Sequence, residues 1–159
     1  MLYASFKALH LLGIVVWVGG MFFMLACLRP AAHAVLDGPT RVRLMHATMR
    51  RFFNAVAIAI VVIFLSGAAM VGAAWREAAK TGLAFNMPLD WYTMIAIFFV
   101  MLAVFVHLRA ALFRRLERAV ADQAWPAAAA LLHAIRWEVM VNLVLGAFII
   151  VVVRLGAGA

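Results

Sequence analysis

Apolar residues in this chain fall into four long runs that are separated by short polar intervals. The runs cover residues 2–28, 52–75, 91–108 and 137–155. Each supplies close to the ~20 residues that an α-helix needs to cross a hydrocarbon core about 30 Å thick. Pro and Gly residues punctuate the intervals, as turns and helix starts require. The pattern predicts an all-α fold: one membrane domain, residues 1–159, with four transmembrane helices in an antiparallel bundle.

Composition leads to the same class of protein. Hydrophobic residues make up 69% of the chain and charged residues 13%, and the mean hydropathy is +1.10. Soluble domains are about half apolar, so we expect the lipid bilayer to be the principal partner of this chain. The four runs leave no room for a soluble domain. Cys27 is the only cysteine, which excludes a disulfide within the chain.

Basic residues are distributed unevenly along the 159 positions. Of the 14 Lys and Arg residues, ten lie in the first and third intervals: Arg29, Arg41, Arg43, Arg50, Arg51, Arg109, Arg114, Arg115, Arg118 and Arg136. Basic residues in short loops stay on the cytoplasmic side. We therefore expect an inner (plasma) membrane protein with both termini outside, in the periplasm if the source is bacterial. The basic residues are expected to contact lipid headgroups and not nucleic acid, because no soluble domain is present to hold a strand.

The first and third intervals also show helical character. Residues 42–51 and 109–121 are basic and amphipathic, which predicts that the second and third membrane helices continue into the cytoplasm. Pro126, followed by four alanines, indicates a further helix start that leads into the last span. The six acidic residues lie in loops or at span ends, and no carboxylate pair, acyl-transfer set or phosphate-binding glycine loop is evident.

His10 is the first candidate for chemistry, because it lies about 10 Å into the first span at 1.5 Å per residue. Phe6, Trp17, Met21 and Met24 fall within about 40° of it on the helix, as does Tyr3. A histidine inside a membrane span is costly and marks a candidate site. One interpretation is a core histidine bonded to a backbone carbonyl or a hydroxyl. The other is a ligand to a metal or to haem.

Three further histidines occur near the cytoplasmic end of the predicted bundle, each within about a turn of an arginine. The pairs are His46 with Arg50, His107 with Arg109, and His133 with Arg136. Neutral imidazoles are axial ligands of haem iron, and arginines pair with propionates, so this pattern favours haem b. The alternative is that they are histidines at the membrane interface. His33, in the first interval, is expected to be exposed.

Sulfur ligands recur every three residues in the first span, at Met21, Met24 and Cys27. Thioether and thiolate groups are soft ligands that select Cu(I), so this triplet, together with His10, is a candidate copper path. Methionine is also an ordinary filler of apolar cores, which is the alternative interpretation of the triplet.

Several short segments resemble the CopD-type copper-resistance membrane proteins and the related HemJ-type protoporphyrinogen oxidases. They are Lys7-Ala8-Leu9-His10, Trp17-Val18-Gly19-Gly20, Phe22 or Phe23, Arg29-Pro30, Arg50-Arg51-Phe52, Leu65-Ser66-Gly67, and Arg136 with Glu138. The resemblance implies a polytopic membrane protein associated with copper handling or with b-type haem.

One departure bears on enzymatic activity. HemJ-type proteins pair the first-span histidine with a lysine early in the third span, whereas this chain has Trp91-Tyr92-Thr93-Met94 there and no lysine after Lys80. This speaks against protoporphyrinogen oxidation by that mechanism. A site that uses His10 would need another partner, for which Met70 and Met94 are candidates.

The main functional prediction is a haem-binding redox protein of the CopD-like group, a b-type cytochrome and candidate oxidoreductase. It would transfer electrons to or from a quinone or a partner protein. The four histidines His10, His46, His107 and His133 favour this prediction, because a copper path through the first span leaves the cytoplasmic group unexplained. The alternative is a copper transport or copper tolerance protein. A third possibility is a helper subunit, and self-association is a further expectation.

Overall fold

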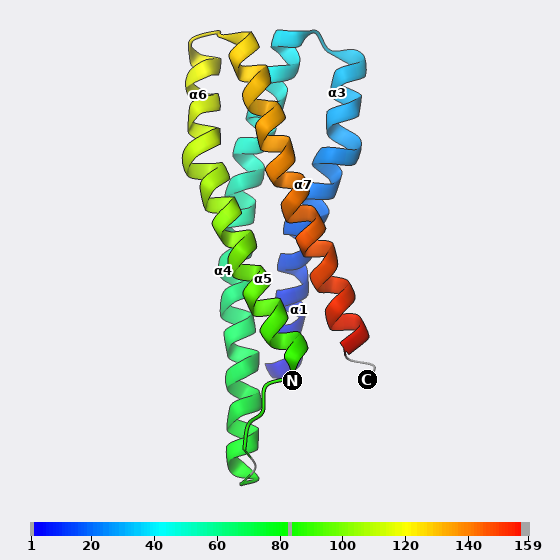
Figure 1. The fold of residues 1–159 in the computed structure, drawn as a ribbon, viewed down its shortest axis with the longest axis vertical. Coiled ribbons are helices and arrows are strands. Elements are labelled where there is room, and N and C mark those ends of the chain that lie inside the picture. The colour runs from blue at the N-terminus through cyan, green and yellow to red at the C-terminus, as the bar shows by residue number, and fades with distance from the viewer. Residues whose placement is uncertain (1, 83, 157–159) are drawn as a thin grey trace.

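The computed structural model describes residues 2–82 and 84–156, and these form a bundle of helices with no strand in the described ranges. Four continuous helical rods are long and apolar enough to cross a membrane: Leu2–Val35, Gly38–Lys80, Leu89–Ala121 and Trp125–Val153. Neighbouring rods lie side by side along the long axis of the molecule (Figure 1). The predicted all-α, four-helix membrane fold is confirmed.

The first rod contains two π-helical turns. It consists of α1 (Leu2–Ile14), η1 (Val15–Gly19), α2 (Gly20–Phe23), η2 (Met24–Leu28) and α3 (Arg29–Val35). A π turn accommodates one extra residue in a helix, and such turns often occur near functional sites.

The second rod is the single helix α4 (Gly38–Lys80), whose 43 residues correspond to about 65 Å. It extends past the start of α1 at the lower end of the bundle (Figure 1). The third rod is α5 (Leu89–His107), η3 (Leu108–Leu112) and α6 (Phe113–Ala121), and the fourth is α7 (Trp125–Gly156). The predicted helical extensions are therefore present. A turn with Gln123 at φ 55° separates α6 from α7.

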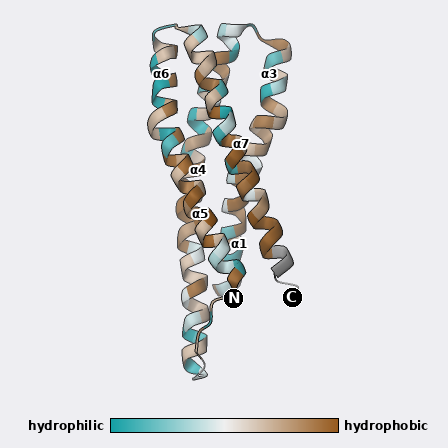
Figure 2. Cartoon of the chain, in the orientation of Figure 1, coloured by the Kyte–Doolittle hydropathy of each residue, from teal (hydrophilic) through white to brown (hydrophobic). Residues whose placement is uncertain are grey.

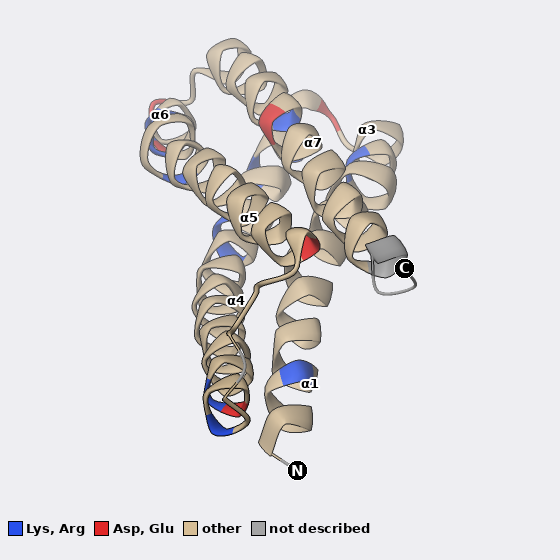
Figure 3. Cartoon of the chain, turned by 60° about the horizontal axis from the view of Figure 1, so that its bottom comes forward, with Lys and Arg blue, Asp and Glu red and all other residues tan. Residues whose placement is uncertain are grey.

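The two ends of the bundle differ. The α3–α4 and α6–α7 connections lie at one end, which we call the loop end. The start of α1 and the end of α7 lie toward the other, which we call the terminal end (Figure 1). Hydrophobic residues dominate the middle of the rods, whereas hydrophilic residues gather toward the ends (Figure 2). Charged residues likewise leave long stretches of helix uncharged (Figure 3). The chain is thus a multi-pass membrane protein whose apolar outer surface contacts lipid.

A column of aromatic rings connects three of the rods. Phe53 of α4 makes edge-to-face contacts with Phe105 of α5 and Phe113 of α6, at centroid distances of 5.9 Å and 5.1 Å. Phe105 in turn meets Trp17 of η1 at 6.3 Å. All four side chains are buried. Such pairs contribute about 0.5–1.5 kcal/mol each beyond their buried area, so the column is a main determinant of packing in the middle of the bundle.

The first rod approaches α4 closely at Gly13. A Cβ atom built on Gly13 would lie 2.7 Å from Cγ1 of Ile63 and 3.3 Å from the carbonyl oxygen of Ala59, whereas one built on Gly19 would meet nothing within 4 Å. Small residues at helix contacts are the usual means of close approach in membranes. Gly13 therefore sets the distance between the two rods.

We expect Gly13→Ala to destabilise the protein by about 1–3 kcal/mol, because the added methyl group must displace Ile63 or the α4 backbone. Gly19→Ala is the matched control and should be neutral or stabilising, since its methyl group enters open space. Thermal unfolding of both variants in the same detergent measures the difference. Equal melting temperatures for the two variants would contradict the close approach.

The start of α4 predicts a dependence of stability on pH. Asp37 is its N-cap residue and accepts a hydrogen bond from the Thr40 backbone N–H at 3.2 Å. Hydrogen bonds from the side chain and the backbone of Thr40 lower the pKa of the Asp37 carboxyl. A lowered folded-state pKa means that the stabilisation is present above the unfolded value, about 4. It is lost as the pH falls through the folded value.

We therefore expect the melting temperature of wild type to fall more steeply than that of Asp37→Asn as the pH is lowered below about 4. Asparagine also caps helices but does not titrate. Parallel melting curves of the two proteins from pH 3 to pH 7 test this. Identical pH profiles would show that the Asp37 cap does not contribute.

Candidate functional site

His10 of α1 is held against α4 by hydrogen bonds. Its Nδ1 lies 3.0 Å from the carbonyl oxygen of Ile63 and 3.1 Å from Oγ of Ser66. A carbonyl oxygen only accepts, so Nδ1 carries the proton and donates it, while the Ser66 hydroxyl donates to the Val62 carbonyl. In the neutral ring this leaves Nε2 with the free lone pair. The carbonyl and hydroxyl partners satisfy the hydrogen bonding of a histidine in the core. The same bonds would also orient the His10 ring if it were a ligand of a metal or of haem.

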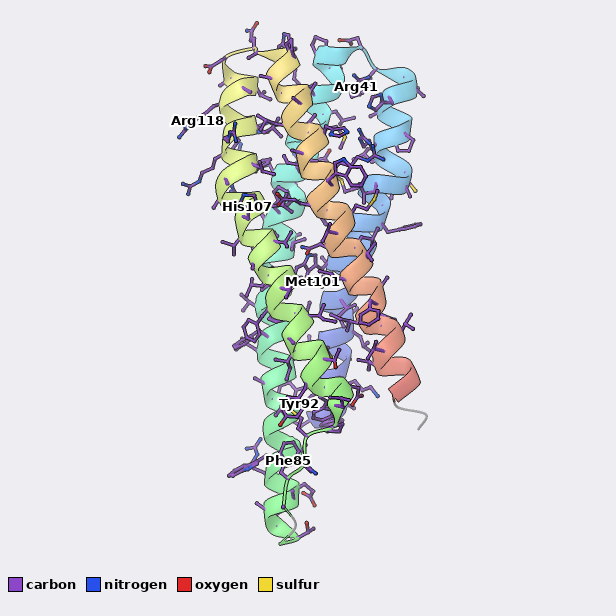
Figure 4. The ribbon with its side chains drawn as sticks, in the orientation of Figure 1. Arg41, Phe85, Tyr92, Met101, His107 and Arg118 are labelled. Carbon is purple, nitrogen blue, oxygen red and sulfur yellow. The ribbon has the colours of Figure 1, made fainter. Side chains whose placement is uncertain are left out.

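His10 lines a cavity of about 540 Å³ at the terminal half of the bundle, between α1, α4, α5 and α7. We call it the His10 cavity. Its walls are almost entirely apolar, and no lining residue is charged. Met94 and Met101 of α5 also line it, so one imidazole and two thioethers line the same partly open cavity. Met101 lies about midway along the bundle (Figure 4). Met70, the other partner considered for His10, is not among the lining residues.

Gly67 makes room for the His10 ring. A Cβ atom on Gly67 would lie 3.3 Å from Cε1 of His10, a contact that would push the ring by a few tenths of an ångström. Gly72 also lines the cavity, but a Cβ atom there would meet nothing within 4 Å. The two glycines form a natural pair for testing whether the position of the ring matters.

A second cavity, of about 170 Å³, lies toward the loop end between η2, α3, α4 and α7. We call it the arginine pocket, because Arg29, Arg41 and Arg136 line it. His33 and His133 line it as well. His33 is exposed to solvent, as expected from the sequence. That His33 lines the same pocket as His133 could not be inferred from either residue's neighbours in the chain.

The histidines toward the loop end have separate surroundings. His46 stacks on Phe113 at 5.4 Å, and its Nε2 is buried without a hydrogen-bond partner. His107 is half exposed and pairs with Glu138 at 3.0 Å. His133 lies edge-on to Trp137. None of the three lines the His10 cavity.

The arginines next to these histidines also differ from one another. Arg50 is exposed, Arg109 lies over the ring of Phe113 at 5.1 Å, and Arg136 lies over Trp137 at 5.7 Å. Of the three, Arg136 lines the arginine pocket together with its neighbouring histidine, His133.

The three sulfur residues of the first rod do not share one environment. Met21 and Met24 are buried in the core, at 2% and 5% exposure, whereas Cys27 is exposed on the outside of the rod. Met24 lines the arginine pocket. In the described part of the chain, no group of three or more His, Cys, Asp or Glu side chains is arranged to hold a metal ion.

Comparison with known families gives a further observation. The family model described as copper resistance protein D matches residues 46–155, which is well over half of the chain. The chain belongs to the copper resistance protein D family. The matched region contains α5 and most of α4 and α7, and it includes Ser66, Met94 and Met101. His10 and the first rod lie outside it. No curated protein and no solved structure matches the chain.

Some of the methionines that line the two cavities of this copper resistance protein D family member were not predicted from the sequence. Met101 was not a candidate, because no spacing or motif in the sequence singles it out among the ten methionines. Met101 lines the His10 cavity because of the way α5 is rotated about its own axis. Met45 and Met49, which line the arginine pocket, were missed for the same reason. Periodicity shows which positions share a face but not which neighbouring helix that face meets.

A substitution at His46 tests whether its buried imidazole has a polar role in this copper resistance protein D family member. We expect His46→Phe to keep or raise the melting temperature, because a buried nitrogen without a partner costs about 1–3 kcal/mol and phenylalanine keeps the stack on Phe113. His133→Phe, at an exposed position, is the control and should leave stability unchanged. A large loss of stability in His46→Phe alone would show that the imidazole has a polar role.

Proposed function

We propose that this protein handles copper and binds Cu(I) in the His10 cavity, where Nε2 of His10 and the thioethers of Met94 and Met101 are donors spaced along the walls. The observation that carries the proposal is the presence of these three soft or borderline donors in one uncharged cavity. Membership of the copper resistance protein D family supports copper as the cargo. Tolerance or transport of the ion in the inner membrane, with both termini outside, is the setting that the charge distribution favours.

The ligand chemistry suits the ion. Thioethers select Cu(I), and imidazole binds copper readily. A metal-binding histidine usually donates its other ring N–H to a carbonyl, carboxylate or water, which fixes the tautomer. Nδ1 of His10 makes such a bond to Ile63, and Ser66 adds a second partner. The ring is therefore oriented before any ion arrives.

The arginine pocket is a poorer place for copper, although Met24, Met45 and Met49 line it. Arg29, Arg41 and Arg136 line the same pocket, and like charges repel strongly where water is scarce. The Met21, Met24 and Cys27 set stays a second hypothesis for a relay. It is supported by the two buried thioethers, and Cys27 is its accessible end.

We expect His10→Gln, Met94→Leu and Met101→Leu each to weaken Cu(I) binding by about tenfold or more, which corresponds to about 1.4 kcal/mol per lost ligand. Leucine conserves the volume of methionine, so the fold is retained. Binding is measured by competition with a coloured Cu(I) chelator, using purified protein under anaerobic reducing conditions. Gly67→Ala should weaken binding through the displaced ring, and Gly72→Ala should not.

Met70→Leu is the matched control, because Met70 lies on α4 near the cavity without lining it. Cys27→Ser and the Met21→Leu, Met24→Leu pair test the relay set in the same assay. If the His10, Met94 and Met101 variants bind Cu(I) as tightly as wild type, the His10 cavity is not the copper site. Weakening confined to the Met21, Met24 and Cys27 variants would favour the relay set.

A second candidate function is the binding of haem b in the same cavity. The observation that favours it is the size of the cavity, about 540 Å³, with apolar walls and one oriented histidine. Histidine and methionine together ligate haem iron in some cytochromes, and Met94 would be the second ligand. A quinone or redox protein would then be the electron partner. A reduced-minus-oxidised spectrum with a sharp α-band, and iron near one per chain, would support haem over copper.

A further inference from the structure

Three arginines from three different helices converge on the arginine pocket. Arg29 belongs to α3, Arg41 to the first turn of α4 and Arg136 to α7, and all three are partly buried. Arg41 lies near the loop end of the bundle, while Arg118 lies on the far side of it, on α6 (Figure 4). Arg118, by contrast, is exposed. The convergence is therefore a feature of the tertiary fold and not of one basic segment.

These guanidiniums have no acidic partner in the described part of the chain. The acidic side chains in contact with basic groups there are Glu77, which pairs with Lys80, and Glu138, which contacts the His107 imidazole. No Asp or Glu lines the pocket. Arg29 lines the same pocket as Arg136 and Arg41, so the three like charges repel one another. Three partly buried like charges without a counter-charge are unfavourable. A bound anion would offset that repulsion.

The remaining walls indicate what kind of anion fits. Met24, Met45, Met49, Leu132 and Val139 provide an apolar lining next to the guanidiniums. The guanidinium of Arg136 also lies over the ring of Trp137, 5.7 Å from its centroid. Arginine binds phosphate oxygens in a bidentate manner, and a phosphate offers more oxygens than a carboxylate to three arginines. The pocket also lies toward the end of a membrane bundle, where phospholipid headgroups are found.

We propose that the arginine pocket binds a phosphate group between Arg29, Arg41 and Arg136. The phosphate belongs either to an anionic phospholipid, whose apolar part meets the methionine-lined wall, or to free inorganic phosphate. The apolar wall favours the lipid. This site is separate from the His10 cavity and does not depend on the copper proposal.

Native mass spectrometry of the full chain in detergent tests the proposal, with dioleoyl phosphatidylglycerol as the anionic lipid and dioleoyl phosphatidylcholine as the reference. We expect one phosphatidylglycerol to bind with about tenfold preference, and each of Arg29→Gln, Arg41→Gln and Arg136→Gln to weaken it by about tenfold. Arg118→Gln removes the same charge from the same end of the bundle and should bind like wild type.

Two further measurements distinguish the sources of the phosphate. Ala129→Phe places a ring in the pocket while keeping all three arginines. Loss of phosphatidylglycerol binding in this variant, with no thermal stabilisation of wild type by inorganic phosphate, identifies the lipid. If inorganic phosphate stabilises wild type but not the arginine variants, and phosphatidylglycerol does not bind, the ligand is the free ion.

The proposal is overturned if a variant that combines Arg29→Gln, Arg41→Gln and Arg136→Gln binds phosphatidylglycerol like wild type and inorganic phosphate stabilises neither protein. It is also overturned if Arg118→Gln lowers lipid binding as much as the pocket variants, because that result would reflect net charge alone. Arginine-to-lysine variants keep the charge and guard against misfolding. They should show an intermediate loss, since lysine lacks the bidentate fork.

Discussion

The close approach of α1 to α4 is the interaction on which the terminal half of the molecule depends. Lipid offers no hydrophobic driving force between helices, so association relies on tight packing and on hydrogen bonds between helices. Gly13 supplies the packing, and His10 supplies the hydrogen bonds one turn away. A greater separation of the two helices would break the bonds from Nδ1. The candidate ligand and the stability of the bundle therefore rest on the same contact.

The two cavities have opposite chemical character. The His10 cavity contains lone pairs and no charge, which suits a soft cation that exchanges water for sulfur and nitrogen. The arginine pocket contains cationic donors and suits an anion. They lie toward opposite ends of one bundle and share α4 and α7 as walls. A change in the packing of either helix would therefore be felt at both cavities.

Much of the fold could be predicted from the sequence. Long apolar runs predict the membrane-spanning helices, and amphipathic periodicity predicts the polar extensions of those helices. The candidate site could be predicted only in part. His10 stood out because a histidine within a span is costly, and Met94 was a candidate partner. Met101 and the convergence of Arg29 with Arg41 depend on how each rod is rotated about its axis. Rotation is decided by side-chain packing between rods, which leaves no periodic mark in a single sequence.

The π turns of the first rod determine the relative directions in which side chains at its two ends point. Both η1 and η2 lie between His10 and Arg29. Each extra residue shifts the angular phase of the helix by about 100°. The two turns therefore change the direction in which later side chains point, so that one rod places His10 in one cavity and Arg29 in the other. Loss of a single residue from either turn would rotate one end of the rod against the other, so that the rod could not serve both cavities.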